Sequence, residues 1–204
     1  MRNSLVRAFT LAAALSTGFS GLATAVEIQG HRGARGLVPE NTLPAFEKAL
    51  ELGVDVLELD TVVTADGVAV IHHDRALSKD HTRRDGAWID REILLNQLTA
   101  AELETYDVGR IRPGSRYAKR FPDQAPVDGT MVPKLSDLFA MVAARGNETI
   151  RFNIETKRSP LQPGDTPEPE AFSRLLIETA RDAGVLDRIT LQSFDWSTLI
   201  AAKR

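Results

Sequence analysis

The residues best suited to chemistry lie close together in the chain, between positions 31 and 74. This stretch holds three of the four histidines, two carboxylates spaced two residues apart, and a glycine-rich turn that carries arginines. Few structural needs explain that mixture of residue types. Carboxylates bind hard divalent cations, arginines grip phosphate with paired hydrogen bonds, and histidines transfer protons near neutral pH. The stretch therefore indicates a site that handles a metal ion and a phosphate group.

Glu58 and Asp60 are the first candidates for metal ligands. They lie two residues apart in an alternating segment, so on a strand both side chains point to the same face. Two adjacent carboxylates repel each other and are costly to bury, and a divalent cation removes that cost. The alternative is an acidic pair that faces solvent, but Val56 and Val62 would then face water as well. We therefore expect Mg²⁺ or Ca²⁺ at this pair.

A second polar segment, residues 153–157, repeats the pattern. Glu155 is predicted to be a third carboxylate ligand. Lys157 could offset the negative charge or bind a phosphate oxygen of the substrate. The alternative is an ordinary charged strand end, because glutamate and lysine two residues apart are common on protein surfaces.

His31 and His73 are predicted to end two different strands beside the acidic residues. A titratable pair across one site suits general acid–base catalysis. His72 alternates with His73, so it should face away and have a structural role. His81 lies in a polar region and is expected at the surface.

Arginines flank the turn that follows His31. Arg32 and Arg35 lie on either side of Gly33, and Arg32 is the expected phosphate contact because it adjoins the histidine. Glu40 and Asn41 could hold the site or could simply form a turn and a helix cap. The chain contains no P-loop, no GxSxG or HExxH motif and no cysteine nucleophile. These residues together predict metal-assisted hydrolysis of a phosphate ester.

Alternating strands and helices must bring these residues together. Strands are predicted at Val26–Gly30, Val54–Thr64, Val68–His72, Thr149–Thr156 and Arg188–Ser193. Helices are predicted after Asn41 or Thr42, over Leu135–Arg145 and Glu170–Ala183, and from Asp195 onward. This order predicts an α/β fold with a parallel sheet. The polar clusters follow the first four strands, which favours a (β/α)8 TIM barrel over a doubly wound sheet.

Residues 75–130 interrupt the alternation. They are polar and rich in arginine, glycine and proline, with one helix predicted at Thr99–Tyr106. We interpret them as a loop region inserted over the core, either functional or a plain surface excursion.

The composition indicates a globular protein without cysteines. Of 204 residues, 43% are hydrophobic and 26% charged, and the net charge of −3 gives no indication of nucleic-acid binding. Residues 1–25 combine a basic start, a short apolar run and a final Ala-Thr-Ala, which predicts a signal peptide. Cleavage after Ala25 would leave a periplasmic or secreted domain at 26–204, without a stable membrane anchor. The alternative is a retained N-terminal helix or anchor.

The sequence resembles the glycerophosphodiester phosphodiesterase family, in its exported, periplasmic type. The matching motifs are HRG at 31–33, PENT at 39–42, ELD at 58–60, HD at 73–74, PKLSDLF at 133–139, NIETK at 153–157 and QSF at 192–194. They run through the chain in order, which makes the match specific.

The resemblance implies a TIM barrel that hydrolyses glycerophosphodiesters to sn-glycerol 3-phosphate and an alcohol. It implies His31 and His73 as the acid–base pair and Arg32 as the phosphate contact. It also implies that Glu58, Asp60 and Glu155 bind Mg²⁺ or Ca²⁺. Two alternatives stay open: a related barrel phospholipase, of the sphingomyelinase D or phosphoinositide-cleaving type, and an inactive fragment.

The predicted strands number five, whereas a (β/α)8 barrel has eight and typically about 250 residues. We therefore expect an incomplete barrel, the N-terminal portion of a longer protein, which is unstable or inactive by itself. Two unpaired sheet edges and one open core face would remain. The sequence predicts no oligomeric state.

Overall fold

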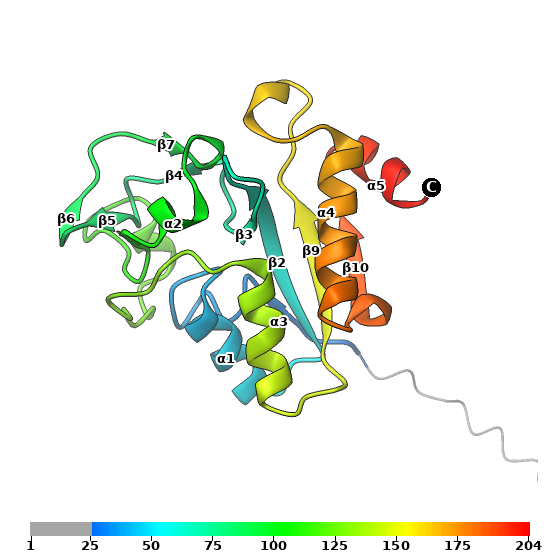
Figure 1. The fold of residues 1–204 in the computed structure, drawn as a ribbon. Helices are drawn as coiled ribbons and strands as arrows, with labels where there is room; N and C mark the ends of the chain where they lie inside the picture. Colours follow the sequence, from blue (N-terminus) through cyan, green and yellow to red (C-terminus); the bar gives the residue numbers. More distant parts are fainter. Residues whose placement is uncertain (1–25) are drawn as a thin grey trace, which may run out of the picture.

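A mostly parallel sheet forms the centre of the molecule in a computed structural model that describes residues 26–204 (Figure 1). The predicted signal peptide, residues 1–25, lies outside the described residues. The strands are β1 (Gln29–His31), β2 (Val56–Val63), β3 (Ala69–Ile71), β9 (Arg151–Thr156) and β10 (Ile189–Gln192). β1, β2, β9 and β10 pair in that order and run parallel, which confirms the predicted α/β class.

Four helices lie side by side along the sheet (Figure 1). They are α1 (Leu43–Glu51), α3 (Leu135–Ala144), α4 (Pro169–Asp182) and α5 (Trp196–Ala202). The main core lies between them and the sheet and includes Leu57, Leu59, Phe139, Phe152 and Phe172. Because strand residues alternate, Leu57 and Leu59 face this core while Glu58 and Asp60 face the opposite side.

The helix ends follow the sequence signals. The Thr42 side chain caps α1 by accepting a hydrogen bond from Ala45 N, and Pro44 lies in the first turn. The Asp195 side chain caps α5 in the same way, by accepting from Ser197 N. Thr42 is thus the cap of α1 among the two candidates Asn41 and Thr42, and Asp195 is a cap as predicted.

The third predicted strand is not a strand of the barrel. The turn at Asp66-Gly67 reverses the chain, so β3 runs antiparallel to β2, with Thr61 opposite Ile71 and Val63 opposite Ala69. The described residues therefore contain four parallel strands rather than five, and they form no closed barrel.

The region 75–130 is more structured than a loop. It contains β4 (Ala76–Leu77), β5 (Arg83–Arg84), β6 (Ala87–Trp88), β7 (Ile93–Leu94), α2 (Ala100–Leu103) and β8 (Tyr106–Asp107). β4 pairs with β7, and β5 pairs with β6 and β8. Leu77, Leu95, Leu103 and Tyr106 form a second core with Val62 of β2. The helix predicted at Thr99–Tyr106 is shorter than expected, because Tyr106 belongs to β8.

Single 3₁₀ turns connect several of these elements, at Leu95–Gln97, Ala118–Arg120, Pro163–Asp165 and Leu186–Arg188. Within residues 26–204, none of the helices has the length and hydrophobicity that crossing a bilayer requires.

Candidate active site

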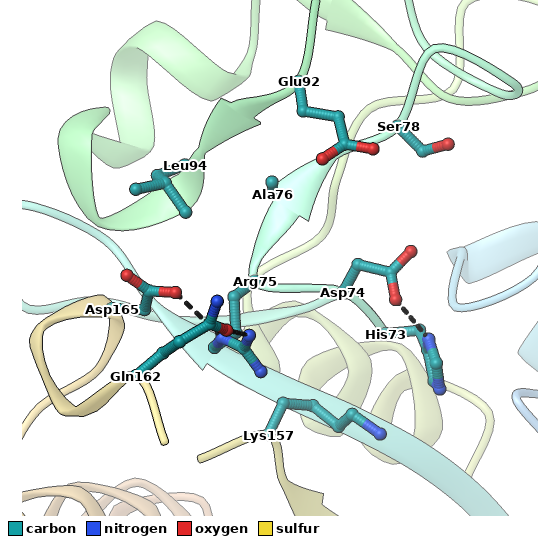
Figure 2. A pocket seen from close by; sticks show the side chains of 10 residues that line it. All are labelled: His73, Asp74, Arg75, Ala76, Ser78, Glu92, Leu94, Lys157, Gln162 and Asp165. Carbon is teal, nitrogen blue, oxygen red and sulfur yellow. Dashed lines mark hydrogen bonds and ion pairs between the residues drawn. The ribbon is translucent and has the colours of Figure 1, made fainter. Parts of the chain in front are cut away.

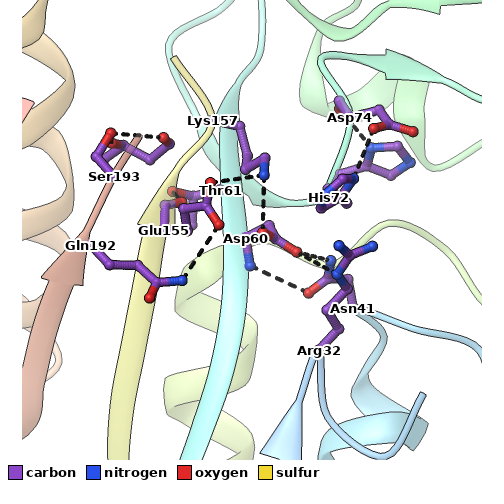
Figure 3. A network of polar contacts seen from close by, with 12 residues as sticks. Arg32, Asn41, Asp60, Thr61, His72, Asp74, Glu155, Lys157, Gln192 and Ser193 are labelled. Carbon is purple, nitrogen blue, oxygen red and sulfur yellow. Dashed lines mark hydrogen bonds and ion pairs between the residues drawn. The ribbon is translucent and has the colours of Figure 1, made fainter. Parts of the chain in front are cut away.

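Strand register places three carboxylates next to one another. Glu58 pairs with Asn153, and Asp60 pairs with Glu155, across β2 and β9. Glu58, Asp60 and Glu155 are all buried, and each offers an oxygen within 4.8 Å of the other two. Figure 3 shows Asp60 and Glu155 on their neighbouring strands. The predicted ligand set is thus brought together on the face of the sheet opposite the main core. We call these three residues the acidic cluster.

Burial and mutual repulsion act on these carboxylates. Burial, followed by the charge of Asp60, raises the pKa of Glu58 to about 7. Burial also opposes ionisation of Asp60, but a 2.8 Å hydrogen bond from Asn41 Nδ2 and the charge of Arg32 lower its pKa below the ordinary value. Asp60 is therefore more readily ionised than Glu58, and a bound cation would favour ionisation of Glu58.

Two cationic side chains border the acidic cluster. Arg32 Nε lies 3.2 Å from Asp60, and Arg32 Nη1 donates to Glu40 at 2.9 Å. Lys157 Nζ lies 2.8 Å from Glu155 and 3.5 Å from Asp60. The structure therefore places both predicted phosphate contacts beside the metal-ligand candidates, as Figure 3 shows for Asp60.

The turn after β1 holds Arg32 in an uncommon conformation. Arg32 has φ of 54°, its N–H donates to Glu58 at 2.8 Å, and its carbonyl accepts from Asn41 N at 3.0 Å. These bonds offset a left-handed conformation that is costly for a residue other than glycine. Gly33 follows with φ of 76°, and a Cβ there would lie 2.6 Å from the Ala45 carbonyl carbon in α1. The HRG motif thus forms a tight turn that packs against α1.

The two candidate catalytic histidines lie on different sides of the acidic cluster. His31 Nε2 is 3.7 Å from Glu58, and its pKa is lowered by burial and then by the charges of Arg35 and Arg32. His73 Nδ1 lies 2.8 Å from Asp74, which leaves Nε2 as the nitrogen free for proton transfer. Register explains the position of His73, because β3 returns along β2 until His72 N donates to the Asp60 carbonyl at 3.0 Å.

The other two histidines lie outside the acidic cluster. His72 is buried, and its Nδ1 lies 2.8 Å from the Asp74 carbonyl, which suits the predicted structural role. His81 was expected at the surface, and that prediction is wrong. Its ring is partly buried and lies 5.7 Å from the rings of both His72 and Tyr117. Its ring neighbours come from other segments of the chain, and sequence periodicity does not reveal such tertiary packing.

The site has further support from Gln192, which lies outside the expected set, and from Glu40, for which a role in the site was one of two alternatives. Gln192 of β10 donates through Nε2 to Glu58 at 3.2 Å and to Glu155 at 3.4 Å. Glu40 receives hydrogen bonds from Arg32 and from the hydroxyl of Tyr117 in the inserted region. The motifs contain Gln192 and Glu40, but only strand register and the folded insertion show what they contact. Arg35 contacts Glu40 and the Phe121 ring.

The acidic cluster fits a hard divalent cation. Three buried carboxylates supply oxygen ligands, as Mg²⁺ and Ca²⁺ require, and Glu58 resists ionisation without a nearby positive charge. The arrangement is an acidic cluster that could hold a cation at the carboxyl edge of a parallel sheet, flanked by histidines and by cationic side chains. Metal-assisted hydrolysis of phosphate esters uses such a combination of groups.

Comparison with known proteins specifies the family. The model of the glycerophosphoryl diester phosphodiesterase family matches residues 31–204, and the chain belongs to this family. The chain is 30% identical to the glycerophosphodiester phosphodiesterase of Caldanaerobacter subterraneus subsp. tengcongensis, over 85% of its own length and 60% of the relative's.

Solved structures agree with this family assignment. A crystal structure from Silicibacter pomeroyi, assigned as a glycerophosphoryl diester phosphodiesterase, superposes with a TM-score of 0.82 at 36% identity. The match covers 88% of this chain and 61% of that one. A phosphodiesterase of Oleispira antarctica, solved with sn-glycerol-3-phosphate, shares the fold at 24% identity and a TM-score of 0.63, over 87% and 61% of the two chains. The chain thus spans less than two thirds of the length of these relatives.

Proposed function

We propose that the protein hydrolyses glycerophosphodiesters to sn-glycerol 3-phosphate and an alcohol, with a divalent cation held by the acidic cluster. The observation that carries the proposal is the acidic cluster itself, which lies within reach of His31, Arg32 and Lys157. Family membership supports the reaction type. The Oleispira antarctica protein, which shares the fold, was solved with a glycerol phosphate product.

The side chains divide the chemical work in this proposal. A bound Mg²⁺ or Ca²⁺ would neutralise charge on the phosphoryl oxygens. Arg32 and Lys157 orient the phosphate from two sides. His31, whose lowered pKa favours the neutral ring, accepts the proton of the attacking nucleophile, which is water or a hydroxyl of the glycerol. Where the glycerol hydroxyl attacks, a water molecule then opens the cyclic phosphate to give glycerol 3-phosphate. His73 then gives a proton through Nε2 to the alcohol oxygen as the bond from phosphorus to that oxygen breaks.

The direct test is release of glycerol 3-phosphate from glycerophosphocholine, with and without EDTA. We expect chelation to abolish turnover and added Mg²⁺ or Ca²⁺ to restore it. His31→Ala and His73→Ala should each lower kcat by at least about 100-fold, the usual contribution of a general acid or base. Turnover that survives both EDTA and His31→Ala would contradict the proposal.

We also propose that the protein is exported and acts in the periplasm or outside the cell. The support is the basic, apolar and Ala-Thr-Ala pattern of residues 1–25. Mass spectrometry of the protein purified from a cell envelope fraction should give Val26 as its first residue. A cytosolic protein that retains residues 1–25 would exclude export.

The inserted region gives no support to the barrel phospholipase. Such an enzyme needs an exposed apolar rim to enter a membrane surface. Across the inserted region 75–130, all of which the structure describes, none of the large hydrophobic side chains is exposed.

A further inference from the structure

A cavity adjoins the acidic cluster on the side of His73. It has a volume of about 520 Å³, in the range of small-molecule sites, and His73 and Lys157 lie at one end of it (Figure 2). Its walls come from two segments far apart in sequence, residues 73–94 and residues 157–165. The cavity therefore continues outward from the place where the phosphate is proposed to bind.

Arg75 joins the two walls. Its Nε donates to Asp165 at 3.1 Å, and its Nη2 donates to Gln162. A bond of 2.8 Å from Asn96 Nδ2 to the Gly164 carbonyl adds a second connection. The inserted region is thus attached to the loop between β9 and α4, and the cavity has defined walls rather than two independent loops.

The charges that line the cavity do not cancel. Arg75 is paired with Asp165, Lys157 with the acidic cluster, and Asp74 with His73. Glu92 remains, and its carboxylate forms no ion pair or hydrogen bond within residues 26–204. Figure 2 shows its side chain pointing into the cavity beside Ser78. Among these lining residues, Glu92 is therefore the carboxylate that lacks a partner.

We propose that this cavity binds the alcohol portion of the diester and that Glu92 favours alcohols that carry an ammonium group. The inference rests on the proposed function and specifies its substrate class. The alcohol oxygen must lie near the phosphate and His73, so the rest of the alcohol extends into the space beyond them. An ethanolamine or choline group there would bring its positive charge toward the free carboxylate of Glu92.

The test compares diesters that differ only in the alcohol. We would measure kcat/KM for glycerophosphoethanolamine, glycerophosphocholine and glycerophosphoglycerol with the full chain and with Glu92→Gln. The parent should prefer the two cationic diesters, and Glu92→Gln should reduce that preference about two- to fivefold, as expected for an exposed ion pair. Glu92→Lys should reverse the preference. Raising the ionic strength should weaken the preference of the parent.

Glu148→Gln is the matched control, because Glu148 is exposed and lies before β9, at the opposite end of that strand from Lys157. It removes the same charge and should leave the preference unchanged. An equal preference in the parent and Glu92→Gln would overturn the assignment of Glu92 while glycerol 3-phosphate release continued. Failure of a parent that unfolds cooperatively and binds Mg²⁺ or Ca²⁺ to hydrolyse any of the three diesters would overturn the proposed function and this inference with it.

Discussion

Among single residues, Glu58 has an environment that opposes its own charge. Burial and Asp60 raise its pKa from 4.5 to about 7, so above pH 7 its ionised form destabilises the folded chain by on the order of 3 kcal/mol. We therefore expect Glu58→Gln to stabilise the chain in EDTA at pH 8. The same substitution removes a cation ligand, so added Mg²⁺ or Ca²⁺ should raise the melting temperature of the parent but raise that of the variant much less.

Urea unfolding in EDTA and thermal unfolding with cation measure the two effects separately. Glu148→Gln serves as the control, because it removes an exposed carboxylate without touching the acidic cluster. Equal stabilisation of parent and Glu58→Gln by the cation would show that Glu58 is not a ligand.

His72 gives a pH dependence of the opposite sign. Burial lowers its pKa from 6.5 to about 4, so the unfolded chain binds a proton that the folded chain excludes between these values. Stability should therefore fall as the pH decreases through this window, by up to about 3 kcal/mol for this residue.

His72→Asn isolates that contribution, because the asparagine Nδ2 can replace Nδ1 as a donor to the Asp74 carbonyl. The free energy of unfolding of the parent, minus that of the variant, should decrease from pH 7 to pH 4. Subtraction cancels the slope of Glu58, which both proteins share. A difference that does not vary with pH would exclude a buried neutral His72.

At the scale of elements, the turn between β1 and α1 positions Arg32. Gly33→Ala would combine a left-handed backbone with a Cβ only 2.6 Å from the backbone of α1. We expect a loss of at least about 2 kcal/mol in the free energy of unfolding, because the conformation alone costs about 1–2 kcal/mol. Gly36→Ala is a control three residues away, since no atom lies within 4 Å of the Cβ it would add. Urea unfolding of both variants tests this, and equal losses would contradict it.

Strand faces and helix caps could be predicted from the sequence. Strand alternation put Glu58 and Asp60 on one face, and the parallel register then placed Glu155 beside them as expected. Local signals also predicted the caps at Thr42 and Asp195. These features depend on residues near one another in the chain or on the two-residue period of a strand.

What could not be predicted depends on contacts between distant segments. A hydrophobic run such as 68–72 reads the same in a parallel or an antiparallel strand, so the reversal of β3 was missed. The short strands of 75–130 acquire their order from packing against Val62. His81 is partly buried because its ring lies against those of His72 and Tyr117. The cavity likewise depends on the contact of Arg75 with Asp165, 90 residues away.

At the scale of the whole molecule, the sheet has two open edges. Within residues 26–204, β1 pairs only with β2 and β10 only with β9. Two large apolar side chains follow β10 within four residues of its end. Phe194 is 89% exposed and Trp196 is 74% exposed. Unpaired strand edges beside exposed apolar side chains favour pairing with another chain.

We therefore expect a chain of residues 26–204 to self-associate as its concentration rises. The double variant Phe194→Ser with Trp196→Ser should weaken this association, because it removes apolar surface next to the open edge of β10. Leu161→Ser is the control: Leu161 is also 89% exposed but lies in the loop between β9 and α4. Sedimentation velocity over a concentration series measures the effect. A parent that stays monomeric throughout, or an equal response to both substitutions, would show that the β10 edge does not drive association.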